Sequence, residues 1–240
     1  MDDTPYLLDP AHWALSGPGS IPELVLQHLG YTFLALAIGF VIAFPVGLLI
    51  GHTGKGSFIA INAGNAGRAL PTMGLLFLLV TLMGLGRVPV YIALVILVIP
   101  PLLTSTYAGL RSVDRAAVDA ARGMGMRESQ ILFQVELPMA LPVVFGGIRS
   151  AALQVVATAT IAAYVGFSGL GRLLVDGLSV NDYGRVLAGA VVVAVLAIVL
   201  DLLLGLVQRY TVSPGVSGRG LQRTRRRRSV AESPLEPDLV

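Results

Sequence analysis

Five long apolar runs constrain this chain more than any other feature of its sequence. They cover residues 29–50, 69–86, 88–110, 150–170 and 186–207, and the only charge in all of them is Asp201. Each run is close to the roughly 20 residues that a helix needs to cross a bilayer. The runs also lack the alternating pattern of barrel strands, so we predict an all-α polytopic membrane protein with about five transmembrane helices. The alternative is a very hydrophobic soluble helical core.

Composition supports a membrane protein and excludes several kinds of site. Charged residues make up 13% of the chain, against about 25% in an ordinary soluble domain. The chain contains no cysteine, which excludes disulfides and thiolate metal sites. Its first 28 residues contain no Lys or Arg, so they lack the basic start of a signal peptide, and we expect the first helix to direct insertion.

The basic residues predict the orientation of the chain. With the N-terminus outside, only Arg87, Arg172 and Arg185 of the 17 Lys and Arg residues lie outside, which leaves 14 inside. The positive-inside rule therefore favours an N-out, C-in topology. We expect an extracytoplasmic segment (1–28), a membrane domain (29–210) with a cytoplasmic loop (111–137), and a disordered basic cytoplasmic tail (211–240). The expected helices run over about 29–51, 69–86, 88–110, 148–168 and 186–207.

The cytoplasmic loop is a polar stretch within this apolar chain. Asp114 can cap a helix that begins at Arg115, and alanines at 116, 117, 120 and 121 give that helix a face of small side chains. Small side chains flanked by charge suit a helix that fits into a groove of another protein. The alternative is a solvated loop that returns the chain to the membrane.

The end of the loop carries residues that stop helices. Gly123 and Gly125 are expected to end or bend the first polar helix. A second polar helix is expected to begin near Arg127, and Pro138 is expected to stop it before the chain re-enters the membrane.

The spacing within the loop resembles the EAA motif of permease subunits in binding-protein-dependent ABC importers. That motif is E-A-A, three residues, G, nine residues, I-x-L-P; the chain departs from it at Asp119 and Val135. In that family the loop forms a coupling helix held in a groove of the cytoplasmic ATPase. The resemblance therefore implies the type I ABC importer permease fold and these coupling residues: Asp119, Ala120, Ala121, Gly123, Gly125, Leu137 and Pro138.

Further matches are similar to the osmoprotectant branch of this family, the permeases for glycine betaine, choline, carnitine or proline. They lie at 28–29, 65–72, 106–110, 121–126, 135–138, 147–149, 159–160 and 169–171. The resemblance implies a prokaryotic plasma (inner) membrane location. It also implies three kinds of partner: ABC ATPase subunits, a second permease subunit (the same or paralogous), and an extracytoplasmic substrate-binding protein. No cofactor is expected on this chain, because ATP and Mg would bind the partner ATPase.

Other functions are weighed against this one. A permease for methionine or another amino acid is the alternative within the family. A secondary transporter is less favoured, because we find no repeated halves and Asp201 lies near one helix end. No catalytic site is expected, because the chain has no GxxxxGK[ST] loop and its histidines, at 12, 28 and 52, are scattered in polar flanks. No metal site is expected, and no nucleic-acid binding, because no folded module accompanies the basic run.

Arg149 and Asp201 are ionisable residues in or beside predicted membrane helices, where such residues are costly and usually paired. Their similar depth in the proposed topology leads us to hypothesise an ion pair. The alternative is that Arg149 reaches the inner headgroups while Asp201 faces a wet cavity.

Candidate residues of the translocation pathway lie on the third and fourth predicted helices. Tyr107 and Tyr164 could bind a quaternary ammonium group through cation–π attraction, and Gln154, Thr158 and Thr160 add polar groups. Aromatic belts at the membrane interface explain the tyrosines equally well.

Arginines gather in the C-terminal tail, at 219, 223 and 225–228. Near the inner leaflet they could bind anionic lipids. Because salt screens such contacts, the tail could sense ionic strength. The alternative is a simple positive-inside anchor.

Overall fold

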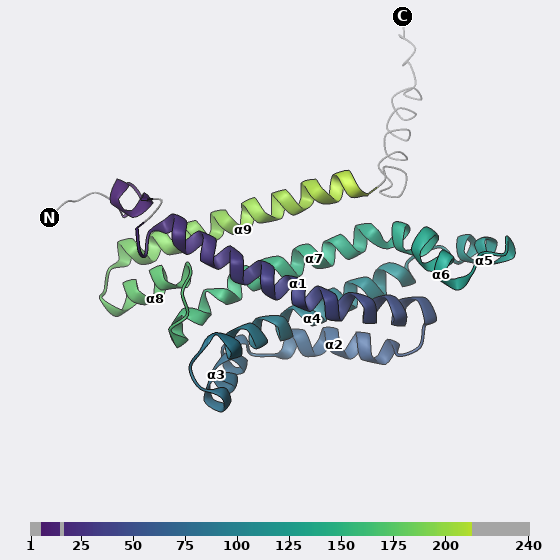
Figure 1. The fold of residues 1–240 in the computed structure, drawn as a ribbon, viewed down its shortest axis with the longest axis horizontal. Helices are drawn as coiled ribbons and strands as arrows, with labels where there is room; N and C mark the ends of the chain where they lie inside the picture. Colours follow the sequence, from purple (N-terminus) through teal and green to yellow (C-terminus); the bar gives the residue numbers. More distant parts are fainter. Residues whose placement is uncertain (1–5, 15–16, 213–240) are drawn as a thin grey trace, which may run out of the picture.

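The computed structural model of this chain describes residues 6–14 and 17–212, and all regular elements within these ranges are helical. The bundle is elongated, with α8 and the N-terminal turn at one end and α5 and α6 at the other (Figure 1). Following the orientation predicted from charge, we call these the outer and inner ends. The elements are η1 (Pro10–Trp13), α1 (Ile21–Thr53), α2 (Ser57–Ala69), α3 (Thr72–Met83), α4 (Arg87–Arg111), α5 (Arg115–Gly123), α6 (Glu128–Ile131), the π-helical turn η2 (Leu132–Glu136), α7 (Leu137–Ala159), η3 (Ile161–Val165), α8 (Gly171–Ser179) and α9 (Tyr183–Thr211).

Four helical segments of the described chain are long and apolar enough to cross a membrane. They are α1, α4, the continuous helical stretch Glu128–Val165 that contains α7, and α9. α2 and α3 are bent by 94° at their junction, and counting this bent pair as one broken span brings the total to five. The prediction of an all-helical membrane protein with about five spans is therefore confirmed.

The second predicted helix, over 69–86, is wrong in detail. The structure shortens it: α2 ends at Ala69, Leu70 and Pro71 are extended, and α3 covers only Thr72–Met83. The cause is Pro71, because the residue before a proline is disfavoured in the α-helical region. Most of α2 lies between the first two expected helices, in a segment where Asn62, Gly64, Asn65 and Gly67 leave no long apolar run.

The fourth predicted helix, over 148–168, is displaced. In the structure α7 begins at Leu137 and ends at Ala159. Pro138 does not stop the preceding helix, because it lies in the first turn of α7, where a missing N–H leaves no bond unmade. Beyond α7, the predicted outer loop contains the short helix α8, which buries Leu173 and Gly177.

The first helix begins earlier than expected, at Ile21 instead of residue 29. Its 33 residues correspond to about 50 Å of helix, well beyond the roughly 30 Å of a hydrocarbon core. The boundary drawn between the segments 1–28 and 29–210 therefore falls inside α1. By contrast, α4 and α9 lie within four residues of the ranges predicted for them.

The helices pack most closely around α4. Gly47 of α1 faces Thr106 of α4, and Gly51 faces Leu110. The facing residues are separated by the same number of positions in both pairs, so the two helices run parallel. Ser105 of α4 lies against Gly147 of α7, and an added Cβ there would stand 2.3 Å from the Ser105 Cβ. Small residues thus allow these backbones to approach closely, as in many membrane bundles. α9 packs on α7 and α8 and leaves most of its surface exposed.

Candidate functional site at the inner end of the bundle

The helix α5 is defined by its two ends, as the sequence predicts. Asp114 accepts a hydrogen bond from the Ala116 N–H at 2.9 Å, which confirms the predicted cap. At the other end Gly125 has φ +82°, a left-handed conformation that glycine adopts without strain. The Met126 N–H then reaches back to the Ala121 carbonyl at 3.2 Å and closes the helix.

α5 has a buried face and an exposed face. Val118 and Ala121 are buried with Leu48 of α1, Leu110 of α4 and Ile131 of α6. Ala121 therefore packs against the body of the protein. The other predicted coupling residues of this region, Asp119, Ala120, Gly123 and Gly125, are exposed. The two remaining predicted coupling residues lie at the start of α7, where Pro138 is exposed and Leu137 is half-buried.

Two large apolar side chains are exposed beside this surface. Met124 is 76% exposed just after α5, and Phe133 is 57% exposed in η2. Sequence reasoning missed both residues; a methionine between two glycines in a polar loop was the available signal for Met124.

Charged side chains tie α5 to α6. Arg122 donates from Nε and Nη2 to the two carboxylate oxygens of Glu128 at 2.8 and 3.0 Å, and from Nη1 to Asp119 at 3.3 Å. These hydrogen bonds to Glu128 raise the pKa of the Arg122 guanidinium above its usual value. All three side chains are exposed, so the contacts add little stability.

His52 joins the same network from α1. Its Nδ1 lies 2.5 Å from Glu136 Oε2, and its Nε2 lies 3.3 Å from Glu128 Oε2. The expectation that the histidines lie in polar flanks holds for His52, beside two glutamates, but is wrong for His28. His28 is fully buried in α1, with Nε2 3.0 Å from the Val156 carbonyl of α7. Neither contact is visible in local sequence, because the partners are far apart along the chain.

Arg149 and Asp201, hypothesised as a pair, lie in contact between α7 and α9. Two hydrogen bonds join them, from Nη2 to Oδ2 at 2.7 Å and from Nε to Oδ1 at 2.8 Å. Gln208 adds a third contact, with its Oε1 3.4 Å from Arg149 Nη1. The Arg149 guanidinium and the Asp201 carboxylate thus form a bidentate ion pair.

The predicted pathway residues do not form one cluster. Tyr107 lies near the inner end of α4, whereas Tyr164 lies in η3 at the outer end. Thr158 is buried, and the Thr160 hydroxyl bonds the Ala157 carbonyl of its own helix.

Gln154 is the one predicted pathway residue that lines a cavity between α2, α4 and α7. This cavity has a volume of about 260 Å³. Its other lining residues are Gly64, Gly67, Pro100, Pro101, Thr104 and Ser150.

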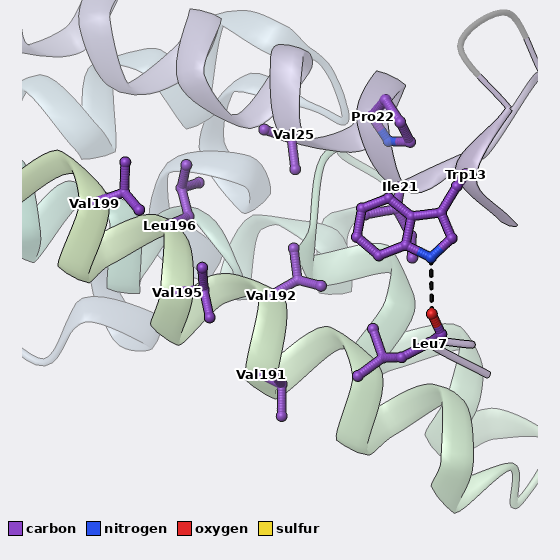
Figure 2. A pocket seen from close by; sticks show the side chains of 10 residues that line it. All are labelled: Leu7, Trp13, Ile21, Pro22, Val25, Val191, Val192, Val195, Leu196 and Val199. Atoms are coloured by element: carbon purple, nitrogen blue, oxygen red, sulfur yellow. Dashed lines mark hydrogen bonds between the residues drawn. The ribbon is translucent and has the colours of Figure 1, made fainter. Parts of the chain in front are cut away.

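A second, larger hollow lies at the outer end. Ten residues of η1, its preceding turn, α1 and α9 line it, as Figure 2 shows. Its volume is about 500 Å³ and almost all of its lining is apolar. Trp13 stands at its edge, with its indole N–H bonded to the Leu7 carbonyl at 2.8 Å. Among the described residues, no group of three His, Cys, Asp or Glu side chains is placed to hold a metal ion.

Comparison with known proteins covers most of the chain. Residues 43–212 match the family described as the binding-protein-dependent transport system inner membrane component. The chain is 31% identical to a glycine betaine/carnitine/choline transport system permease protein of Bacillus subtilis, over 80% of this chain and 88% of that protein. It is 35% identical to an osmoprotectant import permease protein of Salmonella typhimurium, over 87% of this chain and all of that protein.

A solved structure shares the fold. The chain resembles a subunit of a methionine ABC transporter in an inward-facing conformation, with a TM-score of 0.70 and 22% identity over 80% of this chain and 96% of that one.

Proposed function

Because this chain belongs to the family of binding-protein-dependent transport system inner membrane components, we propose that it is the permease subunit of an ABC importer for osmoprotectants such as glycine betaine, choline, carnitine or proline. The names of the Bacillus and Salmonella relatives support this substrate class. The observation that carries the coupling role is an exposed helix with the EAA spacing, which projects from the inner end of an apolar bundle.

The partner at the inner end is an ATPase subunit, which binds ATP and Mg so that this chain itself needs no cofactor. The exposed side chains of α5 contact a groove of that ATPase, with Asp119 and Ala120 on the helix and Met124 as an apolar contact beside it. Met124 supports this role because a thioether side chain adapts to an irregular apolar surface. Ala121 acts from the other side, since it packs α5 onto the body of the permease.

Transport follows from this attachment. Closure of the ATPase pair moves α5 and α6, and the helices that they touch shift the bundle between outward-open and inward-open states. A second permease subunit completes the pathway, and a substrate-binding protein delivers substrate at the outer end. We place a transient substrate contact at the cavity lined by Gln154, because it offers polar groups within an otherwise apolar bundle.

The Arg-rich tail remains a proposed contact for anionic lipid. Residues 213–240 lie outside the described residues, so this proposal rests on composition alone.

Uptake by a reconstituted importer tests the proposed function. The chain, its second permease subunit and its partner ATPase are reconstituted in liposomes with ATP inside. The binding protein and labelled glycine betaine, choline, carnitine, proline or methionine are added outside. The proposal expects ATP-dependent uptake of at least one of the first four and none of methionine. Uptake of methionine alone would assign the chain to the amino-acid alternative.

A further inference from the structure

A histidine at the inner end of α1 contacts α6 and η2, the segment that connects α5 to α7. His52 lies in the last turn of α1, and its two ring nitrogens face Glu136 of η2 and Glu128 of α6. Glu128 in turn accepts two hydrogen bonds from Arg122 of α5, which also contacts Asp119. One chain of polar contacts therefore runs from α1 to the exposed face of α5.

The innermost contact of this chain is the most buried. The Glu136 side chain is 2% exposed and the His52 side chain 15% exposed. A buried carboxyl group is unfavourable without a hydrogen-bond partner, and His52 is the partner of Glu136. The surrounding contacts between α1 and this loop are apolar, through Leu48. Apolar contacts are non-directional, whereas the hydrogen bond sets one position of the loop against α1.

Glu136 also ends a backbone turn of unusual geometry, η2. Residues Leu132–Glu136 form a π-helical turn inside a continuous helical stretch, and the Leu137 N–H bonds the Leu132 carbonyl. π-Helical turns of this kind are rare and concentrate at functional sites. One extra residue in a turn rotates all later side chains by about 100° relative to a regular α-helix. Glu136 stands at the end of this turn, beside α1.

We propose that His52 and Glu136 are positioning residues of the coupling step. They clamp the segment α5–η2 to α1, so that movement imposed on α5 reaches α1 directly, in addition to α7, into which η2 continues. The proposal rests on the proposed function, because it needs an ATPase that moves α5. Without the clamp, α5 still binds the ATPase, but its movement reaches α1 only through the non-directional apolar contacts at Leu48 and shifts α1 less.

The test is a double-mutant cycle in the reconstituted importer. His52→Ala, Glu136→Ala and the double variant are compared with the wild type for ATP hydrolysed per substrate imported. The clamp predicts that each single variant raises this ratio about tenfold or more while the ATPase still copurifies, and that the double variant is no worse than the singles. Thr53→Ala is the matched control, because its exposed hydroxyl bonds only its own helix, at the Leu49 carbonyl, and the adjacent turn. A ratio for His52→Ala equal to that of the wild type overturns the proposal.

A rescue experiment separates coupling from mere folding. The chain has no cysteine, so His52→Cys with Glu136→Cys supplies the only two thiols in this subunit. The double-cysteine variant should be uncoupled, and a short thiol-specific cross-linker between the two positions should restore uptake. Uptake that falls further after cross-linking would show that the two residues must separate during transport, which contradicts a lasting clamp. Wild-type uptake tests the proposed function separately from these ratios.

Discussion

Arg149 of α7 and Asp201 of α9 meet through two hydrogen bonds of 2.7 and 2.8 Å at the inner half of the bundle. α9 otherwise contributes few buried residues, chiefly Ala188, Gly189 and Leu200. A charged pair is therefore a main directional contact between α9 and the rest of the protein, in a region where an unpaired charge is costly.

The first prediction concerns this pair. Arg149→Met and Asp201→Leu should each lower the yield of folded protein several-fold, because each leaves its partner unpaired. The double variant should recover much of the loss, since it removes both charges together. Size-exclusion profiles and thermal midpoints in detergent measure the effect. Losses in the double variant as large as the sum of the single losses would contradict the pairing.

The second prediction uses two neighbouring glycines of α7. A Cβ on Gly147 would lie 2.3 Å from the Ser105 Cβ, whereas a Cβ on Gly146 meets nothing within 4 Å. Gly147→Ala should therefore destabilise the protein by about 1–3 kcal/mol or more. Gly146→Ala should be neutral or stabilising, by up to about 1 kcal/mol. Thermal unfolding of the two variants side by side measures the difference, and equal midpoints would show that α4 and α7 do not approach this closely.

The third prediction separates the two faces of α5. Ala121→Asp places a carboxylate among Val118, Leu48 and Ile131, so it should lower thermal stability and the yield of the subunit itself. Ala120→Asp lies on the exposed face and should leave the subunit stable while weakening its copurification with the ATPase. The reverse pattern would mean that α5 turns its other face to the partner.

The fourth prediction addresses the cavity between α2, α4 and α7. Gln154→Leu removes a polar group from its lining and should reduce uptake several-fold, with no change in copurification of the ATPase. Thr160→Val is the control, because the Thr160 hydroxyl bonds its own helix outside this cavity. Equal uptake by both variants would remove Gln154 from the pathway.

Some elements of this fold could be predicted because their cause is local. The long apolar runs of α4 and α9, interrupted only by the charge of Asp201, predict both helices within four residues. Asp114 and Gly125 predicted the ends of α5, because a cap and a left-handed glycine act over a few residues. α2 was missed because a short helix rich in Asn and Gly resembles a loop, and it is covered by α4 only in the folded bundle.

In the candidate site, too, features with a local cause could be predicted, and contacts between distant residues could not. The spacing of the EAA motif indicated the surface, but it could not tell which residues of α5 face inward, because that depends on packing against α1 and α4. Ala121 is the example. The contact of His52 with Glu136 spans 84 positions, and no local pattern signals it. Arg149 and Asp201 could be inferred only because a topology placed them at similar depth.

The central claim is that the exposed face of α5 binds an ATPase, and single cysteines test it most directly. The natural sequence has none, so Ala120→Cys and Ala121→Cys each give this subunit one thiol, in adjacent positions. In membranes that contain the whole importer, a thiol-specific photo-cross-linker should join residue 120 to the ATPase subunit and leave residue 121 largely unjoined. No cross-link from residue 120, with the ATPase present and hydrolysing ATP, would contradict the account.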